Sequence, residues 1–139
     1  MIVGGLGGEK AVGRPVHSER DLTEAIRAGF RQEAVRYVAS ASGQTLKEMS
    51  AYLRVSYRSV MRRNNQVHLA STESDRLFRL VRIMVLAEHY IGDRGKAMGW
   101  LRYPNQALGG STPLELLDTE LGAREVEDVL GRIAYGGVS

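Results

Sequence analysis

The chain has 139 residues, a hydrophobic content of 43% and a formal net charge of +3, which suits one domain or two small ones. It contains no cysteine, so disulfides, thiolate metal sites and cysteine nucleophiles are excluded. No apolar run approaches the roughly 20 residues of a membrane span, and the first residues lack the pattern of a signal peptide. We therefore expect a soluble, cytoplasmic protein that makes no membrane contact.

The N-terminal third is predicted to be helical after a short arm. Residues 1–16 contain five glycines, a proline and few large apolar side chains, and we expect them to form a mobile arm. Ser18 then caps a helix whose apolar residues recur at helical spacing. A second helix opens at Phe30 and stops near Gly43. The alternation of Val, Ile or Thr that would indicate strands is missing here.

Residues 45–63 have the length and pattern of a helix-turn-helix. Thr45 opens a capping box, in which its hydroxyl and a glutamate carboxylate each satisfy a backbone amide. A tight turn follows at Arg54, and Ser56 caps the second helix. Small Ser50 lies where the two helices would cross closely. Such turns usually carry glycine, so Arg54 is expected to be strained in a left-handed conformation.

This segment is strongly basic. Residues 44–65 carry five basic groups and one acidic group, which is typical of a surface that binds phosphates. A structural helical hairpin with solvated arginines is the alternative. We favour DNA binding, by a dimer on a two-fold-related operator, because arginine reads guanine edges or grips phosphates. The residues expected to contact DNA are Ser56, Tyr57, Arg58, Ser59, Arg62, Arg63 and Asn64.

The rest of the chain is predicted to be helical as well. The longest helix covers roughly residues 73–91, and Gly92-Asp93 separates it from a short helix that carries Trp100. After a turn-rich segment, Thr112-Pro113-x-Glu115 specifies another short helix. A final helix buries Val126, Val129, Leu130 and Ile133. The predicted fold class is all-α, with a small helix-turn-helix bundle at 17–70 followed by a helical C-terminal domain at 71–139.

No residue pattern indicates catalysis, a metal site or a cofactor. The three histidines have no metal-ligand spacing, and His89 is expected to be a partly buried helix residue. The acidic residues Glu125, Glu127 and Asp128 complement the dipole of the last helix. Phosphate-loop and Gly-x-Ser-x-Gly motifs do not occur in the sequence. We therefore expect no enzyme activity and no bound cofactor.

The C-terminal segment has the character of a docking surface. Residues 104–139 carry six acidic and two basic groups, so a basic middle and an acidic end suggest two partners of opposite sign. The segment from Pro104 to Pro113 is mostly turn, and apolar Leu108 within such a surface loop suits contact with a partner. Trp100 is expected either to fill the core or to contact a partner protein. Residues 135–139 are expected either to be a frayed chain end or to contact a partner.

Several linked motifs resemble one known family. They are Glu73-Ser74-Asp75-Arg76-Leu77, Ala97-x-x-Trp100-Leu101, Pro104-Asn105, Leu108-Gly109-Gly110-x-Thr112-Pro113, Gly122-Ala123-x-x-Val126, Leu130-x-Arg132-Ile133 and Gly136/Gly137-Val138. In this order they resemble the antitoxins of the Xre/MbcA/ParS type, which restrain toxins of the RES class. The resemblance covers most of the chain from about residue 18 and is densest from Glu73 to Ser139.

The resemblance implies a type II antitoxin with an Xre-like helix-turn-helix and a C-terminal toxin-binding domain. Such an antitoxin dimerises, joins its RES-domain toxin in a higher-order complex, and binds its own promoter. The toxin degrades NAD, and the C-terminal end of the antitoxin blocks its NAD pocket. The alternative is a free-standing transcription regulator whose C-terminal domain oligomerises or senses a ligand. The toxin-binding residues implied are Trp100, Pro104, Asn105, Leu108, Gly109, Arg132, Tyr135, Gly136, Gly137, Val138 and Ser139.

Overall fold

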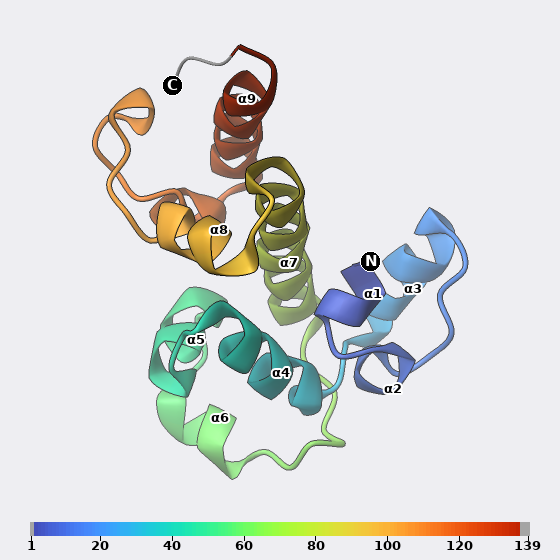
Figure 1. Cartoon of the computed structure of the whole chain (residues 1–139). Helices are drawn as coiled ribbons and strands as arrows, with labels where there is room; N and C mark the ends of the chain where they lie inside the picture. The colour runs from blue at the N-terminus through green and yellow to red at the C-terminus, as the bar shows by residue number, and fades with distance from the viewer. Residues whose placement is uncertain (1, 137–139) are drawn as a thin grey trace. The chain divides into compact units, whose positions relative to one another are not determined.

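The computed structural model describes residues 2–136, with the side chains of residues 2–134 (Figure 1). This part of the chain forms nine α-helices and two short 3-10 helices and no β-strand, apart from an isolated bridge between Arg31 and His68. The predicted all-α class is confirmed. The chain divides into two compact units, the first up to Val81 and the second from Arg82. The division falls inside α7 (Ser71–Ile91), whereas the sequence suggested a boundary before that helix.

The N-terminal segment forms helices where the sequence suggested an arm. It contains α1 (Ile2–Gly5) and α2 (Glu9–Val12), and α2 packs against α4 (Gln32–Ser42). Leu6, Ala11 and Val12 are at most 1% exposed, and the Arg31 backbone N–H donates to the Ala11 carbonyl oxygen at 2.8 Å. The few apolar residues of this segment therefore belong to the core of the first unit.

The remaining helices of the first unit begin at the capping residues that the sequence predicts. They are α3 (Glu19–Ala28), α5 (Leu46–Leu53) and α6 (Tyr57–Arg62), capped by Ser18, Thr45 and Ser56. Thr45 and Glu48 form both halves of a capping box, with N···O distances of 2.9 and 3.0 Å. α4 begins two residues after Phe30, because the Phe30 carbonyl oxygen accepts the Leu69 backbone N–H at 2.7 Å and so does not take part in the helix. Phe30 itself is fully buried, and its N–H donates to Ser74 Oγ at 2.9 Å.

The second unit contains the end of α7, then α8 (Arg94–Leu101) and α9 (Glu120–Gly136), with two 3-10 helices, η1 (Gln106–Leu108) and η2 (Leu114–Asp118), between them. The predicted capping box at Thr112 and Glu115 is present and opens η2, which is a 3-10 helix. Hydrogen bonds from the Thr112 backbone N–H and hydroxyl lower the pKa of Glu115. The fully buried core residues of this unit are Ile83, Ala87, Ala97, Leu101, Leu117, Ala123, Val126 and Leu130.

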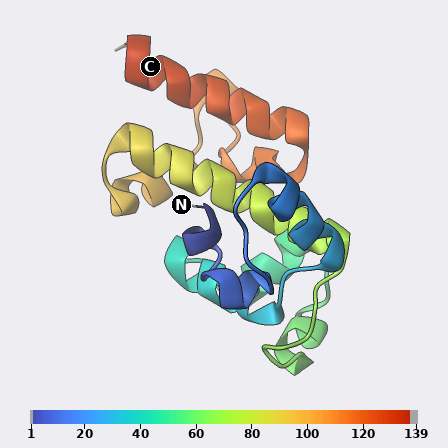
Figure 2. The ribbon, with the colours of Figure 1, turned by 90° about the vertical axis from the view of Figure 1, so that its right-hand side faces the viewer.

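One arginine joins the two long helices of the second unit. Arg82 Nη2 lies 3.0 Å from Glu120 Oε2 and 2.9 Å from Glu127 Oε1, so α7 from residue 82 onward is tied to the N-terminal half of α9. Figures 1 and 2 both show α9 alongside this part of α7. The described helices include none that is both long and apolar enough to cross a bilayer.

Candidate functional site

The helix-turn-helix is built from α5, a three-residue turn and α6. Ser50, Leu53 and Val60 are buried where α5 and α6 meet, as the sequence pattern predicts. Arg54 lies in the turn with φ 60° and ψ 43°, the left-handed conformation expected for this position. For a residue with a side chain this conformation costs roughly 1–2 kcal/mol.

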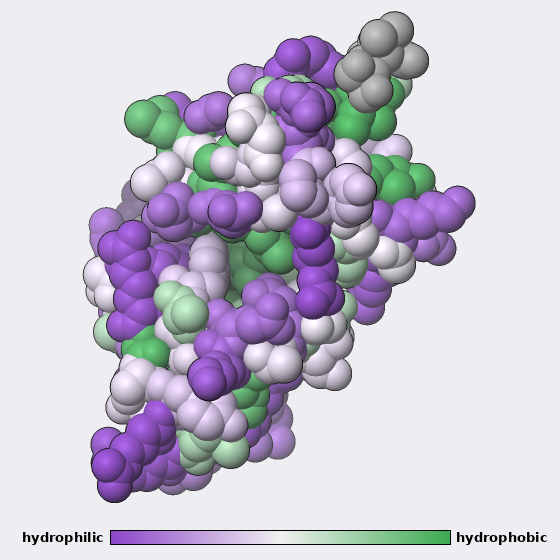
Figure 3. Space-filling view, turned by 90° about the vertical axis from the view of Figure 1, so that its left-hand side faces the viewer, coloured by the Kyte–Doolittle hydropathy of each residue, from purple (hydrophilic) through white to green (hydrophobic). Residues whose placement is uncertain are grey.

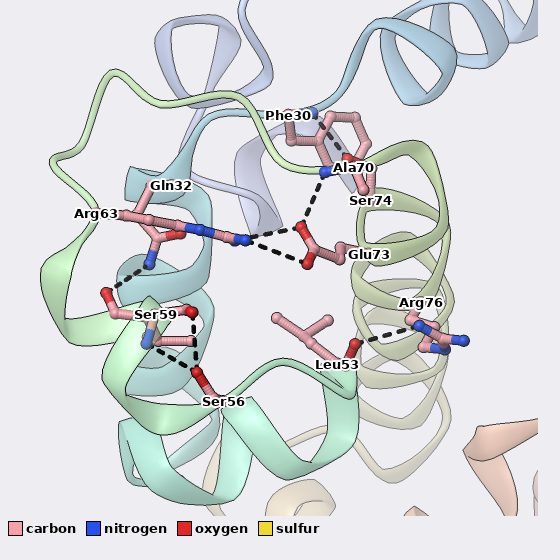
Figure 4. Close-up of polar contacts among 11 residues, drawn as sticks. Phe30, Gln32, Leu53, Ser56, Ser59, Arg63, Ala70, Glu73, Ser74 and Arg76 are labelled. Atoms are coloured by element: carbon pink, nitrogen blue, oxygen red, sulfur yellow. Dashed lines mark hydrogen bonds and ion pairs between the residues drawn. The ribbon is translucent and has the colours of Figure 1, made fainter.

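α5 is fixed to α7 by two polar contacts within the first unit. The Tyr52 hydroxyl donates to the Arg76 carbonyl oxygen at 2.7 Å. Arg76 Nη1 donates to the Leu53 carbonyl oxygen at 3.2 Å (Figure 4). Burial raises the pKa of Tyr52, so its hydroxyl stays a donor at neutral pH. The end of α5 is therefore held firmly, and with it the start of the turn that leads to α6.

α6 exposes a short basic surface. Tyr57 is 45% exposed, and the side chains of Arg58 and Arg62 are exposed without a hydrogen bond or ion pair to the other described residues. Because Arg58 and Arg62 are four residues apart, they lie on one face of the helix. Hydrophilic residues cover the lowest part of Figure 3, at the height of α6 and the segment after it in Figure 1.

Arg63, which the sequence suggested as a DNA contact, takes part in an internal ion pair. Its Nη1 and Nη2 atoms lie 3.2 and 3.4 Å from the two carboxylate oxygens of Glu73 (Figure 4). Glu73 is 8% exposed and also accepts the Ala70 backbone N–H at 2.8 Å. Removing Arg63 would leave the buried carboxylate of Glu73 without its cation. The geometry therefore supports a structural role for Arg63.

Three further residues of the predicted DNA surface make local hydrogen bonds. Ser56 Oγ accepts the Ser59 backbone N–H at 3.0 Å and lies 2.9 Å from Ser59 Oγ. Asn64 Oδ1 accepts the Gln66 backbone N–H at 2.9 Å. These bonds define where α6 begins and how the chain leaves it. Of the predicted DNA contacts, Tyr57, Arg58 and Arg62 remain as side chains that α6 offers to a partner, beside the exposed Met61.

The second unit contains a groove of about 740 Å³ between α9 and the segment that runs from α8 to η1. Its wall is mixed: an indole, aliphatic groups and amides surround a single charged group, that of Arg132. Such a mixture of apolar surface and a few polar groups is typical of a binding groove. The lining residues are Trp100, Pro104, Asn105, Gln106, Ala107, Val129, Arg132 and Ile133.

The groove unites four of the residues that the resemblance implied for toxin binding: Trp100, Pro104, Asn105 and Arg132. Asn105 also shapes the loop, because its side chain accepts the Ala107 backbone N–H at 2.9 Å. The sequence did not single out the other lining residues as part of this surface. Val129 and Ile133 follow the i, i+4 spacing of the buried stripe of α9, which in the sequence is indistinguishable from core.

Leu108 does not lie on the surface, contrary to the expectation from the sequence. It is only 7% exposed, because the 3-10 turn of η1 directs it toward α9. Gly109 follows as an exposed residue with φ 69°, outside the lining of the groove. Tyr135 and Gly136 belong to the last turn of α9, while Gly137, Val138 and Ser139 lie outside the described residues.

The described side chains contain no group of three or more His, Asp or Glu residues that could hold a metal ion. His68 Nδ1 lies 2.9 Å from the Gly29 carbonyl oxygen. His89 is exposed, so the expectation that it is partly buried was wrong; its ring lies beside that of Tyr90 with a centroid distance of 5.2 Å. The two candidate binding surfaces of the described residues are therefore α6 and the groove beside α9.

Comparison with known proteins identifies the family of the domain that contains the groove. Residues 86–136 match the family described as the antitoxin Xre/MbcA/ParS C-terminal toxin-binding domain. The chain is 32% identical to an Antitoxin Xre of Yersinia enterocolitica over 129 residues, which cover 91% of this chain and 87% of the relative. It is 33% identical to an Antitoxin Xre of Photorhabdus laumondii over 132 residues, covering 94% and 89% of the two chains.

A more distant match covers about half of each chain. It is 34% identical over 82 residues to a Prs ADP-ribosylating antitoxin of a Sphingobium strain, with 52% of this chain and 51% of the relative aligned. The matched domain contains every residue that lines the groove. The chain therefore belongs to the Xre family of antitoxins, and is a non-enzymatic member of a toxin–antitoxin system that binds its toxin through this C-terminal domain.

Proposed function

We propose that this antitoxin neutralises a RES-domain toxin that degrades NAD, and that the toxin docks in the groove beside α9. The observation that carries the proposal is that one groove gathers Trp100, Pro104, Asn105 and Arg132 within the toxin-binding domain. Tryptophan and arginine are the residue types that most often dominate binding energy at interfaces. One relative's name couples the antitoxin to ADP-ribosylation, a reaction that consumes NAD.

The inhibitory element in this proposal is the segment after the groove. α9 forms one wall of the groove and continues to Gly136, so a toxin seated there would also meet residues 135–139. Residues 104–139 carry six acidic and two basic groups. A pocket that binds the anionic dinucleotide NAD is expected to be basic. The acidic groups, which lie between Glu115 and Asp128 and so before residues 135–139, suit the surface around such a pocket.

Deletion of residues 136–139 tests this element. We expect the truncated antitoxin to co-purify with the toxin, because the groove is intact, while NAD hydrolysis returns to the rate of the free toxin. The measurement is NADase activity of the co-expressed complex, with native mass spectrometry giving its stoichiometry. Leu121→Ala, on the exposed part of α9, is the control and should leave inhibition unchanged. Full inhibition by the truncated protein would refute occlusion by this segment.

We further propose that the antitoxin regulates its own operon by binding operator DNA through α6. Arg58 and Arg62 support this role because they are exposed, unpaired within the described chain and on one helical face. α6 is only six residues long and therefore reaches few bases. A specific site thus requires a dimer with two copies of α6 on a two-fold-related operator.

Replacing Arg58 and Arg62 together by alanine should weaken operator binding and flatten its salt dependence. Each lost phosphate contact reduces the slope of log K against log salt by about 0.9, so two per protomer give about 1.8. Fluorescence anisotropy with a duplex from the region upstream of the gene measures both quantities. Arg20→Ala with Arg27→Ala removes the same charge from α3 of the same unit and is the matched control. Equal losses in the two double variants would argue against a contact at α6.

A further inference from the structure

The turn of the helix-turn-helix contains the one described non-glycine residue with a left-handed backbone. Arg54 has φ 60° and ψ 43°, while the other described residues with positive φ are glycines. The conformation is imposed by its surroundings: the Arg54 N–H donates to Ala51 O and the Val55 N–H to Ser50 O, at 3.2 and 3.0 Å. A glycine would make the same backbone bonds without a steric penalty from Cβ.

The side chain of Arg54 makes no polar contact with the described residues that would offset the strain of its backbone. It is exposed and makes no hydrogen bond or ion pair with the other described residues. The neighbouring groups do serve the fold, since Leu53 is 1% exposed and its carbonyl oxygen accepts Arg76 Nη1 (Figure 4). Backbone strain that no contact within the protein offsets is typical of residues that bind a ligand or partner.

The position of Arg54 indicates what that function is. It precedes Ser56, the N-cap of α6, by two residues, so it lies beside the end of α6 that carries Tyr57 and Arg58. In a helix-turn-helix the first residues of the second helix enter the major groove, and the preceding turn lies at the edge of the groove, where the phosphates are. Arg54, Arg58 and Arg62 then form a basic series from the turn to the end of α6.

We propose that Arg54 contacts a backbone phosphate beside the groove that α6 enters, and thereby positions α6 on the operator. This inference rests on the proposed DNA-binding function of α6. In this proposal the arginines that face DNA are Arg54, Arg58 and Arg62. Arg63 is not among them, because it is paired with Glu73. A phosphate contact carries no base preference, so Arg54 contributes affinity and register on every sequence.

The test is Arg54→Gly, which removes both the charge and the strain. We expect it to bind the upstream duplex about tenfold more weakly, because a charge-assisted hydrogen bond is lost. The salt slope should fall by about 0.9 for each protomer bound, and binding to a random duplex of equal length should weaken by the same factor. Its Tm should rise by about 3 °C in a thermal melt, because the left-handed turn is relieved.

Two variants separate the contact from general electrostatics. Arg54→Lys keeps the charge, so its affinity should stay close to that of the natural protein. Arg20→Ala removes one exposed charge from α3 and should change the affinity far less than Arg54→Gly does. Unchanged affinity and salt slope in Arg54→Gly, or an equal loss in Arg20→Ala, would overturn the inference. If the natural protein binds neither duplex, the DNA-binding function itself fails and Arg54 loses its role, although the rise in Tm remains.

Discussion

Replacing Gly122 by alanine is expected to unfold the toxin-binding unit at temperatures where the natural protein is stable. Gly122 is buried at the start of α9, and a Cβ atom there would overlap the carbonyl group of Leu116 in η2. The atoms of Leu116 that the added Cβ would meet belong to the backbone, which cannot move aside as a flexible side chain could, and α9 packs directly against η2. We expect a loss of about 3 kcal/mol or more in the free energy of unfolding, and a Tm lower by about 10 °C.

Gly131→Ala is the matched control, because it adds the same methyl group to the same helix. A Cβ atom at Gly131 meets nothing within 4 Å, so the substitution should raise stability by about 0.5–1 kcal/mol through its higher helix propensity. Thermal melts followed by circular dichroism compare the two variants, and pull-down with the toxin shows whether the unit still binds. A Gly122→Ala protein with the natural Tm would mean that α9 and η2 are not held together as closely as the structure shows.

The helix boundaries of this chain were largely predictable because their signals are local. Ser18, Thr45 and Ser56 each cap the helix that the sequence predicts, through bonds to backbone amides three residues away. The left-handed turn at Arg54 was predictable in the same way, since the pattern places it where such a turn usually has glycine. Bonds that span three residues need no knowledge of the tertiary structure.

The roles of single side chains were less predictable because they depend on distant partners. Arg63 has the spacing of a DNA contact, but the loop after α6 returns the chain so that Glu73 meets it ten residues later. Leu108 lies in a turn-rich segment typical of a surface, yet η1 directs it into the core. Likewise, Leu6 is a single apolar residue among glycines and is fully buried. These outcomes depend on tertiary packing, which overrides local pattern.

Filling the groove with a large side chain is expected to weaken toxin binding strongly without disturbing the fold. Ala107 lines the groove from η1 and is exposed, so Ala107→Trp places an indole in the space that the toxin would occupy. Loss of a central interface contact costs about 2 kcal/mol or more, which corresponds to roughly 30-fold in Kd. Isothermal titration of the toxin, or competition pull-down where the toxin is too active to purify, measures the change. The Tm of the variant should stay within about 2 °C of the natural value, because the backbone bonds of η1 are unchanged.

Leu121→Trp adds a similar bulk to the outer surface of α9, where Leu121 is 72% exposed, and should leave the Kd unchanged. The comparison also separates docking from inhibition. Ala107→Trp should lose both binding and inhibition, whereas deletion of residues 136–139 should lose inhibition alone. If Ala107→Trp binds the toxin with natural affinity while Leu121→Trp does not, the toxin docks on the outer surface of α9, and the acidic groups exposed there become the contacts to test.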